Sequence, residues 1–238
     1  MIAFLSSRAG LPIVAAAAAL LGAGTTWIAT RQNTGIAVRD FLLSHPEVIP
    51  EAMQKLQERE SGKIIAEHYA DIVTPIGSAW AGNPKGDVTV VEYLDYNCSF
   101  CRASLPIVAE LIASDPKVKL VFREMPVLSE ESVTAARYGL AVARQGGNYR
   151  KLHDALYAGG PLSNAGIDRA VASIGLDPRA IKKASADPQV DATIKDNLRL
   201  MRQLNQNGTP AWIIGNRVIS GLMTIDDMRA AVTAARAK

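Results

Sequence analysis

Asp95-Tyr96-Asn97-Cys98-Ser99-Phe100-Cys101-Arg102 is the stretch that decides the fold, because it joins a buried strand to a helix. The apolar, β-branched run 88–94 before it predicts the strand, and residues 102–111 after it predict the helix. The stretch holds both cysteines of the chain, two residues apart. At the start of a helix, unpaired amide N–H groups and the helix dipole stabilise a thiolate on Cys98, and Cys101 is near enough to close a small, reducible disulfide. The spacing therefore indicates a redox site.

Two structural explanations of the cysteine pair are weaker. A disulfide between Cys98 and Cys101 would close a very short loop and would add little stability. A structural zinc site usually needs four ligands, and the chain has no second Cys-x-x-Cys pair. The histidines match no ligand spacing; they are His45, His68 and His153. We therefore expect no metal site and no cofactor, although metal handling by the pair, or an inactive pair, stays open.

The composition is that of an ordinary globular protein, with 48% hydrophobic residues, 21% charged residues and a net charge of +3. The chain is long enough for one large domain or for one domain with an appendage. Because the small positive charge is not gathered in a basic cluster, the sequence gives no case for nucleic-acid binding. Two cysteines alone do not identify the compartment, which has to be inferred from the N-terminus.

The N-terminus has the pattern of an export signal. Residues 1–8 carry one basic side chain, and residues 9–30 carry no charge and are rich in Ala, Leu, Ile and Val. Residues 1–30 are therefore predicted to be a signal peptide that directs the chain across the inner membrane into the periplasm. Cleavage after Ala23 or Gly24 is favoured, but because no clean Ala-x-Ala site occurs, the alternative is a retained membrane anchor over residues 9–30. Either way the chain lies where disulfide chemistry is expected.

Residues 36–72 are predicted to be a helical segment that is separate from the domain after it. The apolar positions form a narrow stripe among many charged residues, so the segment must dock on the domain or associate with copies of itself. Both alternatives stay open, and the segment is a candidate for homo-oligomerisation. Ser61-Gly62 interrupts the helical pattern and predicts a hinge. Pro and Gly residues over 75–86 predict a linker or an entry hairpin.

Residues 76–238 are predicted to form one α/β domain. Gly215-Asn216 lies between two apolar runs and predicts a hairpin, and Thr224 is the expected cap of a last helix. A strand, a helix and a strand, then a helical insertion, a hairpin and a closing helix give a sheet with helices on both sides. The expected elements after the first helix are a strand over 118–123, several helices within about 130–206, strands over 211–214 and 217–220, and a helix over 225–235.

With these elements in place, the sequence resembles the thioredoxin fold with a helical insertion, and specifically the DsbA-like family of extracytoplasmic thiol–disulfide oxidoreductases. The resemblance covers roughly residue 76 to the C-terminus and rests on Asp95-Tyr96-x-Cys98-x-x-Cys101, the helical insertion and Gly208-Thr209-Pro210 before a strand. The helical segment before the domain, with His45-Pro46-Glu47-Val48, is similar to the N-terminal region of the ScsC-like branch. Some members of that branch oligomerise through this region and act as disulfide isomerases.

The motif and the resemblance assign a role to each candidate site residue. Cys98 is expected to be the exposed nucleophile that enters mixed disulfides with substrates, and Cys101 the more buried resolving thiol. The resemblance implies that Thr209 and Pro210 form a cis-proline loop beside the cysteines, where backbone groups pair with an extended substrate and Thr209 modulates Cys98. It also implies that Glu92, within an otherwise apolar strand, is a buried acid that accepts the proton of Cys101. The alternative for Glu92 is a strand residue that faces water.

Ser99-Phe100, the pair between the cysteines, departs from the Pro-His pair of strongly oxidising relatives. Without that histidine one source of thiolate stabilisation is missing, which predicts a less oxidising couple and leaves isomerase and reductase roles open beside that of an oxidase. Tyr96 and Trp212 are expected to pack near the site rather than to take part in the chemistry.

The sequence therefore predicts an extracytoplasmic enzyme, a protein thiol–disulfide oxidoreductase or disulfide isomerase that acts on unfolded or misoxidised proteins. The resemblance implies a membrane redox partner that resets the cysteine pair, either DsbB-like or DsbD/ScsB-like. The alternative is a copper(I)-binding, copper-tolerance protein that uses the same two thiolates, because soft thiolates suit Cu(I). A third reading is a membrane-tethered structural factor with an inactive redox site.

Overall fold

The computed structural model describes residues 37–237, which divide into two units after Leu56. The first unit contains a helical stretch at residues 37–44 and the beginning of α3 (Val48–Glu67). The second contains the rest of α3, the short helix α4 (Tyr69–Val73) and the whole sheet. Residues 1–30, for which we predict an export signal, lie outside the described part. Between residues 37 and 237, no helix is long and apolar enough to span a bilayer.

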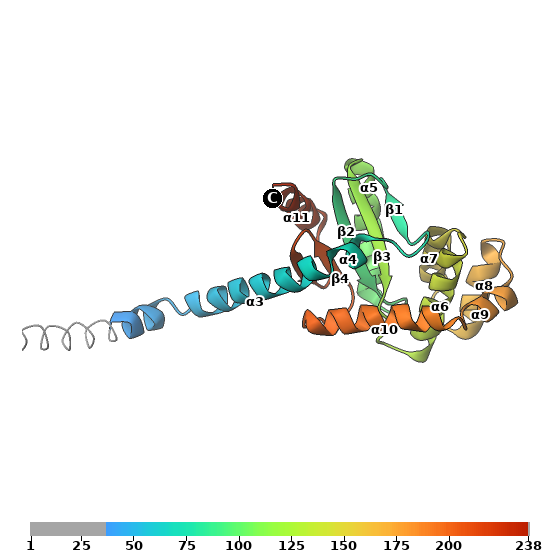
Figure 1. Cartoon of the computed structure of the whole chain (residues 1–238), viewed down its shortest axis with the longest axis horizontal. Coiled ribbons are helices and arrows are strands. Elements are labelled where there is room, and N and C mark those ends of the chain that lie inside the picture. The colour runs from blue at the N-terminus through green and yellow to red at the C-terminus, as the bar shows by residue number, and fades with distance from the viewer. Residues whose placement is uncertain (1–36, 238) are drawn as a thin grey trace, which may run out of the picture. The chain divides into compact units, whose positions relative to one another are not determined.

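A five-stranded mixed sheet forms the centre of the second unit, with the order β1-β3-β2-β4-β5 (Figure 1). β2 runs parallel to β3, and the other neighbouring pairs are antiparallel. The helix α5 (Ser99–Ser114) joins β2 to β3, because parallel neighbours need a crossover connection. The strands are β1 (Trp80–Gly82), β2 (Val88–Leu94), β3 (Val118–Glu124), β4 (Ala211–Ile214) and β5 (Arg217–Ser220).

The central strand β2 is buried on both faces, which explains its nearly continuous apolar sequence. Val90 and Leu94 point into one core, and Val91 and Tyr93 into another. The first core lies between the sheet and α5, α11 (Ile225–Arg236) and the helical insertion. The second core lies between the sheet and α4 and α10 (Pro188–Gln203). The prediction of a sheet with helices on both sides is therefore confirmed.

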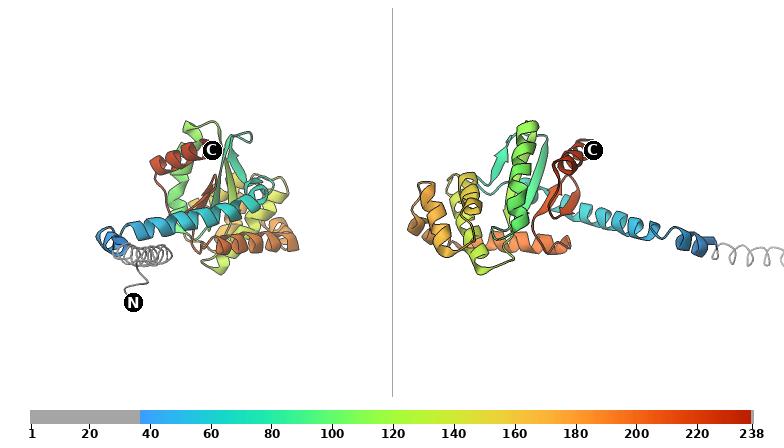
Figure 2. Two further views of the ribbon diagram at one scale, coloured as in Figure 1. Left: turned by 60° about the vertical axis from the view of Figure 1, so that its left-hand side comes forward. Right: turned by 180° about the vertical axis from the view of Figure 1, so that it is seen from behind.

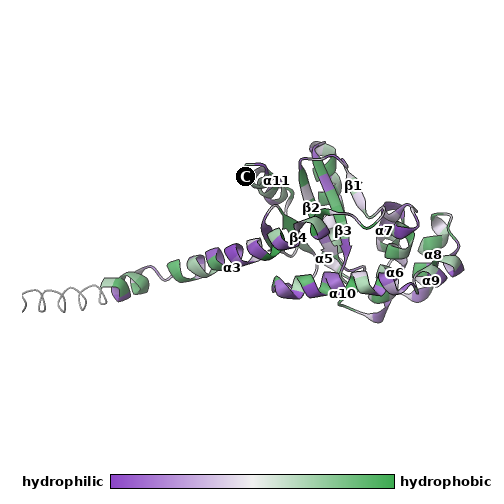
Figure 3. Ribbon diagram, viewed as in Figure 1, coloured by the Kyte–Doolittle hydropathy of each residue, from purple (hydrophilic) through white to green (hydrophobic). Residues whose placement is uncertain are grey.

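The helical insertion between β3 and β4 begins each of its helices at a residue that caps the first turn. Figure 2 shows α6 to α9 grouped at one side of the sheet. In Figure 3, hydrophilic and hydrophobic residues alternate along α10, whose buried face includes Val190, Ile194 and Met201. The remaining helices are α6 (Glu130–Arg144), α7 (Tyr149–Ala158), α8 (Asn164–Ser173) and α9 (Pro178–Ala184), and the caps of α6 to α10 are Ser129, Asn148, Ser163, Asp177 and Asp187.

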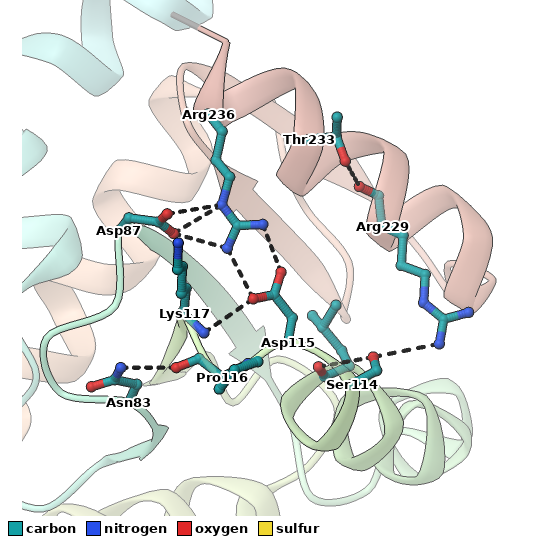
Figure 4. A network of polar contacts seen from close by, with 10 residues as sticks. Asn83, Asp87, Ser114, Asp115, Pro116, Lys117, Arg229, Thr233 and Arg236 are labelled. Carbon is teal, nitrogen blue, oxygen red and sulfur yellow. Dashed lines mark hydrogen bonds and ion pairs between the residues drawn. The ribbon is translucent and has the colours of Figure 1, made fainter.

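Ion pairs tie the last turn of α11 to the β2–α5–β3 unit (Figure 4). Arg236 donates to Asp115 Oδ2 at 2.7 Å and to Asp87 Oδ1 at 2.9 Å. These hydrogen bonds raise the pKa of Arg236 and lower the pKa of both carboxyls. Two helical turns earlier, Arg229 pairs with Glu110 on α5 at 2.9 Å. Because the groups are largely exposed, they position α11 more than they stabilise the fold.

α3 runs without a break from Val48 to Glu67, so the hinge predicted at Ser61-Gly62 is wrong. In the part of α3 that belongs to the second unit, Ser61 and Ile65 are buried, and Ile65 belongs to the core shared with α4 and α10. This part of the helix docks on the domain, which was one of the two alternatives. In the first unit, large apolar side chains are exposed instead: Val38, Phe41, Leu43, Ile49, Met53 and Leu56.

Two expectations about the strands need correction. Residues 80–82, within the stretch predicted to be a linker or an entry hairpin, form the edge strand β1, antiparallel to β3. The strand expected over 118–123 extends by one residue to Glu124, which pairs with Leu94. The β4–β5 hairpin turns at Gly215-Asn216 as predicted, and Gly215 takes the positive φ of 61° that such a turn requires.

Candidate active site

Cys98 is the N-cap residue of α5, as the motif predicts. Its sulfur accepts a hydrogen bond from the backbone N–H of Cys101, with 3.4 Å between Sγ and N. Both cysteines are free thiols in this structure. Cys98 is 7% exposed and Cys101 is 0% exposed. Cys98 is therefore less open than the sequence predicts, but it is the more accessible of the two cysteines.

The loop before β4 lies against Cys98. The Thr209-Pro210 peptide bond is cis, as the resemblance implies. The Cys98 thiol donates to the carbonyl oxygen of Thr209, with 3.2 Å between the two atoms. The backbone N–H of Gly221 donates to the carbonyl of Pro210 at 2.8 Å, which anchors the loop to the end of β5. The fold thus brings together the two segments that the sequence singles out.

The two sulfurs have opposite electrostatic environments. A hydrogen bond from the Cys101 side chain, helped by the side chain of Thr209 and by backbone N–H groups, lowers the pKa of Cys98 to about 5, against the raising effect of burial. Burial raises the pKa of Cys101 well above its ordinary value, and the charge on Glu92 adds to this rise. The Cys98 thiolate is thus stabilised without a histidine in the motif. The weaker thiolate predicted from Ser99-Phe100 is not what the local geometry provides.

Glu92 is buried beneath α5, with 2% of its surface exposed, so the alternative of a strand residue facing water is wrong. Ser104, one turn after Cys101 on α5, donates a hydrogen bond from Oγ to Glu92 Oε1 at 3.0 Å. Burial raises the pKa of Glu92 to about 8, against the lowering effect of this hydrogen bond. A carboxyl group with a pKa near neutrality is able both to accept and to return a proton.

Asp95 holds the segment before Cys98 in place. Its Oδ1 accepts from the backbone N–H of Asn97 at 2.8 Å and from Ser132 Oγ at 2.6 Å. Its Oδ2 accepts from the backbone N–H groups of Val127 and Leu128, at 2.8 Å and 3.0 Å. One carboxylate therefore joins the start of α5 to the β3–α6 connection, which fixes the geometry of the N-cap.

Sequence reasoning missed a buried polar group next to this segment. Tyr96 and Trp212 are buried packing residues, as predicted, and Trp212 Nε1 donates to the carbonyl of Gly221 at 2.9 Å. The hydroxyl of Tyr96, however, lies 3.0 Å from Oε1 of Glu124, a buried carboxyl at the end of β3. The sequence offers one signal for Glu124: it continues the alternation of Leu120 and Phe122, both of which face the first core.

Exposed apolar side chains lie on the active-site helix and on two segments that are bonded to the loops next to Cys98. Phe100 lies between the cysteines, and 59% of its surface is exposed. Two more belong to the connection that Asp95 anchors, and another follows Gly221, which is bonded to the Thr209-Pro210 loop. Four exposed apolar residues thus belong to the segment that holds Cys98 or to segments near the loops beside it. We call this set the apolar rim; its members are Phe100, Val127, Leu128 and Leu222.

A family profile described as Thioredoxin matches residues 74–234, and one described as Copper resistance protein ScsC N-terminal domain matches residues 35–61. In the described part of the chain, no group of three or more His, Cys, Asp and Glu side chains is placed to hold a metal ion. The match to the thioredoxin profile covers more than half of the chain and includes every candidate site residue.

Solved structures of oxidoreductases superpose on the chain. A thioredoxin-like oxidoreductase from Silicibacter pomeroyi is 36% identical, over 71% of this chain and 98% of that chain, with a TM-score of 0.68. A linker-deletion variant of ScsC from Proteus mirabilis is 25% identical, over 87% and 95%, with a TM-score of 0.71. The thiol–disulfide exchange protein α-DsbA2 from Wolbachia pipientis is 27% identical, over 75% and 97%, with a TM-score of 0.67.

A curated relative is the Na(+)/H(+) antiporter NhaA 3 of Salinispora tropica, 30% identical over 176 residues. These residues are 71% of this chain but 27% of that protein, so the chain spans about a quarter of the relative's length. The fold, the paired cysteines at a helix N-terminus and these matches lead to one conclusion. The chain belongs to the thioredoxin family and lies among its DsbA-like and ScsC-like thiol–disulfide oxidoreductases.

Proposed function

We propose that this protein is an extracytoplasmic thiol–disulfide oxidoreductase that forms or isomerises disulfides in other proteins. The observation that carries the proposal is the asymmetry of the cysteine pair. Cys98 lies at a helix N-terminus with a pKa lowered to about 5, whereas Cys101 is fully buried with a raised pKa. A thiolate near the surface and a protonated thiol behind it are what nucleophilic attack and later resolution require.

In the oxidising direction, a substrate thiolate attacks Cys98 Sγ in the Cys98–Cys101 disulfide. The S–S bond breaks, a mixed disulfide forms, and the Cys101 thiolate takes the proton of Glu92. A second substrate thiolate then attacks the substrate sulfur of the mixed disulfide and releases Cys98 as a thiolate, which its low pKa makes a good leaving group. The substrate loses two electrons and the protein gains them. A DsbB-like membrane partner would accept these two electrons and restore the Cys98–Cys101 disulfide, whereas a DsbD/ScsB-like partner would donate two electrons and restore the dithiol that isomerisation needs.

In the isomerising direction, the Cys98 thiolate attacks a wrong disulfide in the substrate, and a different substrate thiolate displaces Cys98. No net electrons are transferred. When the substrate stalls, Cys101 attacks the mixed disulfide, and Glu92 accepts the proton that Cys101 must lose. The apolar rim supports unfolded or misoxidised proteins as substrates, because such chains expose apolar segments that a folded protein buries.

Replacing each cysteine separately tests this proposal. We expect Cys98→Ala to lose all exchange with a scrambled disulfide protein. We expect Cys101→Ala to accumulate mixed disulfides, visible by mass spectrometry, because the resolving thiol is missing. Turnover by Cys98→Ala equal to that of the unaltered protein would refute the proposal.

Exposed apolar side chains in residues 37–56 support self-association as the basis of isomerisation, because several sites held together retain a substrate between attacks. Substituting Ile49→Asp and Met53→Asp together changes two of these side chains and leaves the docked part of α3 intact. We expect a lower molecular mass by light scattering and a lower isomerase rate, with retained thiol oxidation. A Glu51→Gln variant is the matched control on the same helix. An unchanged mass would remove self-association through this segment.

The match of residues 35–61 to a copper-resistance profile keeps the copper(I) alternative as a second candidate. Two free thiols at a helix N-terminus form a two-sulfur donor set of the kind that suits Cu(I). Titrating the reduced protein with Cu(I) against a competing chelator tests it. Sub-micromolar binding in a protein that shows no disulfide exchange would favour copper handling over the redox function.

A further inference from the structure

Glu124 lies close to Glu92 in the same buried layer. In the parallel pair of β2 and β3, Glu92 is level with Phe122 and Leu94 is level with Glu124, so both carboxyls point to the face of the sheet that α5 covers. Diagonal neighbours on one face of a sheet lie roughly 7–8 Å apart. Glu124 is 1% exposed and Glu92 is 2% exposed. Two carboxyl groups are therefore buried on one face of the sheet, and Glu92 is the one whose charge acts on Cys101.

The surroundings of Glu124 are built to hold a carboxylate. Tyr149 on α7 donates its hydroxyl to Glu124 Oε1 at 2.7 Å, and the hydroxyl of Tyr96 lies 3.0 Å from the same oxygen. Oε2 has no hydrogen-bond partner in the described residues. Gly139 on α6 makes the space, because a β-carbon there would lie 2.7 Å from Oε1 and 3.4 Å from the Tyr96 hydroxyl. A buried acid that no ion pair neutralises is costly for the fold.

The group connects directly to the active site. Tyr96 is two residues before Cys98, and Tyr157 on α7 donates its hydroxyl to the carbonyl of Asp95 at 3.0 Å. His153 packs against both rings, with its centroid 5.7 Å from that of Tyr96 and 5.0 Å from that of Tyr157, and neither of its nitrogens has a partner in the described residues. A polar, aromatic layer thus extends from the first turn of the active-site helix to Glu124.

The other ionisable groups around the two carboxyls do not gain or lose a proton near neutral pH. Burial lowers the pKa of His153 to about 3, so its ring is neutral. Burial raises the pKa of all three tyrosines well above the ordinary value, so their hydroxyls are protonated. Cys98 ionises near pH 5, and Cys101 keeps its proton. The other charged side chains that act on the pair are Arg150 from α7 and Asp95 from the active-site loop.

We propose that Glu124 is a positioning residue that controls the protonation of Glu92, and through it the pH at which Cys101 resolves mixed disulfides. This inference rests on the proposed redox function. Two tyrosine hydroxyls face Glu124, whereas one serine hydroxyl donates to Glu92. Burial raises the pKa of Glu124 to about 8, and the charges on Asp95 and Glu92 add to this rise. Because two buried like charges resist joint ionisation, the two carboxyls titrate as a pair, and a charge on Glu124 keeps the proton on Glu92.

The direction in which Glu124→Gln shifts the pH profile follows from the loss of the negative charge on Glu124. Resolution needs Glu92 in its ionised form as the base for Cys101, so the rate rises with pH through the pKa of Glu92. Glu124→Gln removes the neighbouring negative charge and lets Glu92 ionise at lower pH. A Coulomb interaction across a buried separation of this size corresponds to about one pH unit. Below both midpoints, the resolution rate of Glu124→Gln therefore exceeds that of the unaltered protein by about tenfold.

The experiment isolates the step that Cys101 performs. A small thiol such as cysteamine is attached to Cys98 as a mixed disulfide, and its release is followed by stopped flow from pH 5 to pH 9.5. We expect the rising limb of the Glu124→Gln profile to lie about one pH unit lower. Tyr149→Phe removes one donor from Glu124 and destabilises its anion, so its profile shifts the same way by a smaller amount. A role in packing alone would slow release at every pH without moving the midpoint.

Two controls separate the possible failures. Glu67→Gln makes the same charge change at an exposed position on α3 and leaves the profile unmoved. Glu92→Gln abolishes the rise of the release rate with pH. Coincident midpoints for the unaltered protein, Glu124→Gln and Tyr149→Phe would overturn the role of Glu124 while leaving the redox function intact. Failure of the unaltered protein to release the small thiol at any pH would instead overturn the redox function. Tyr149→Phe decides the question if Glu124→Gln does not fold.

Discussion

The two faces of the sheet each bury a group that normally carries a charge, but the two groups differ in how many hydrogen-bond partners they have. On the face covered by α4 and α10, Arg123 donates from one nitrogen to the backbone carbonyls of Asp71, Ile72 and Thr74, which end α4. On the face covered by α5, Glu92 receives one hydrogen bond from a serine hydroxyl. The first group stays charged and acts as a helix cap, whereas the second has a pKa raised to about 8.

We propose that this contrast separates a structural buried charge, Arg123, from a functional one, Glu92. The guanidinium of Arg123 replaces lost water with three acceptors, so its burial contributes to holding α4 on the sheet. The carboxyl of Glu92 is left with too few donors to ionise easily, which costs stability but produces a group that changes protonation near neutral pH. Strongly shifted pKa values next to a reactive sulfur are typical of functional sites.

The largest effect is expected for Glu92→Gln. The folded protein holds the proton of Glu92 up to about pH 8, whereas in the unfolded chain the group ionises at its ordinary pKa of 4.5. Stability is therefore lost as pH rises from 4.5 to 8, and glutamine, which does not titrate, avoids this loss. We expect Glu92→Gln to be more stable than the unaltered protein by about 3–5 kcal/mol at pH 8.5, and nearly equal at pH 5. Urea unfolding at both pH values measures this, and equal destabilisation at both would contradict it.

Arg123→Met tests the other face. It leaves three helix-end carbonyls without their shared donor, so we expect a loss of about 3 kcal/mol in the free energy of unfolding. The loss should be the same at pH 5 and at pH 8.5, because Arg123 stays charged throughout. Lys119→Met is the matched control, since within residues 37–237 Lys119 Nζ donates one hydrogen bond, to the carbonyl of Val73 at 3.2 Å. A loss of stability that differs between pH 5 and pH 8.5 for Arg123→Met would contradict the distinction between the two faces.

A smaller effect is expected at the apolar rim. Phe100→Ser removes an exposed apolar side chain without touching either sulfur. We expect KM for an unfolded protein substrate to rise about fivefold, corresponding to about 1 kcal/mol of lost apolar contact. The rate with a small disulfide such as oxidised glutathione should not change. Equal losses on both substrates would mean that Phe100 acts on the sulfur chemistry itself.

The sequence was sufficient for the elements that show a strong local pattern. The run 88–94 is apolar over its whole length because β2 is central, and the cysteine spacing placed Cys98 at the helix start. Trp80–Gly82 is too short for any periodicity, and its pairing with β3 is a property of the sheet edge. Ser61-Gly62 was misread because a polar pair that packs on a sheet looks, in sequence, like a break in a helix.

The parts of the site that sequence reasoning missed come from distant segments. Glu124 ends a strand next to Arg123, and in sequence the two look like one solvated charged pair. Only the register with β2 shows that their side chains enter opposite cores. Tyr149 and His153 lie in the helical insertion, and nothing in their local sequence connects them with Cys98. Their role depends on how α7 packs over the end of β3.

The proposed disulfide exchange depends most on the ionisation of Cys98. Absorbance of the reduced protein at 240 nm reports thiolate formation, and only one step is expected below pH 9, because Cys101 keeps its proton. We expect the Cys98 thiolate to form with a midpoint at about pH 5, mainly because of the hydrogen bond from Cys101. A midpoint at or above the ordinary cysteine pKa, about 8.5, would contradict the account, since Cys98 would then have neither the nucleophilicity nor the leaving ability that the proposed chemistry requires.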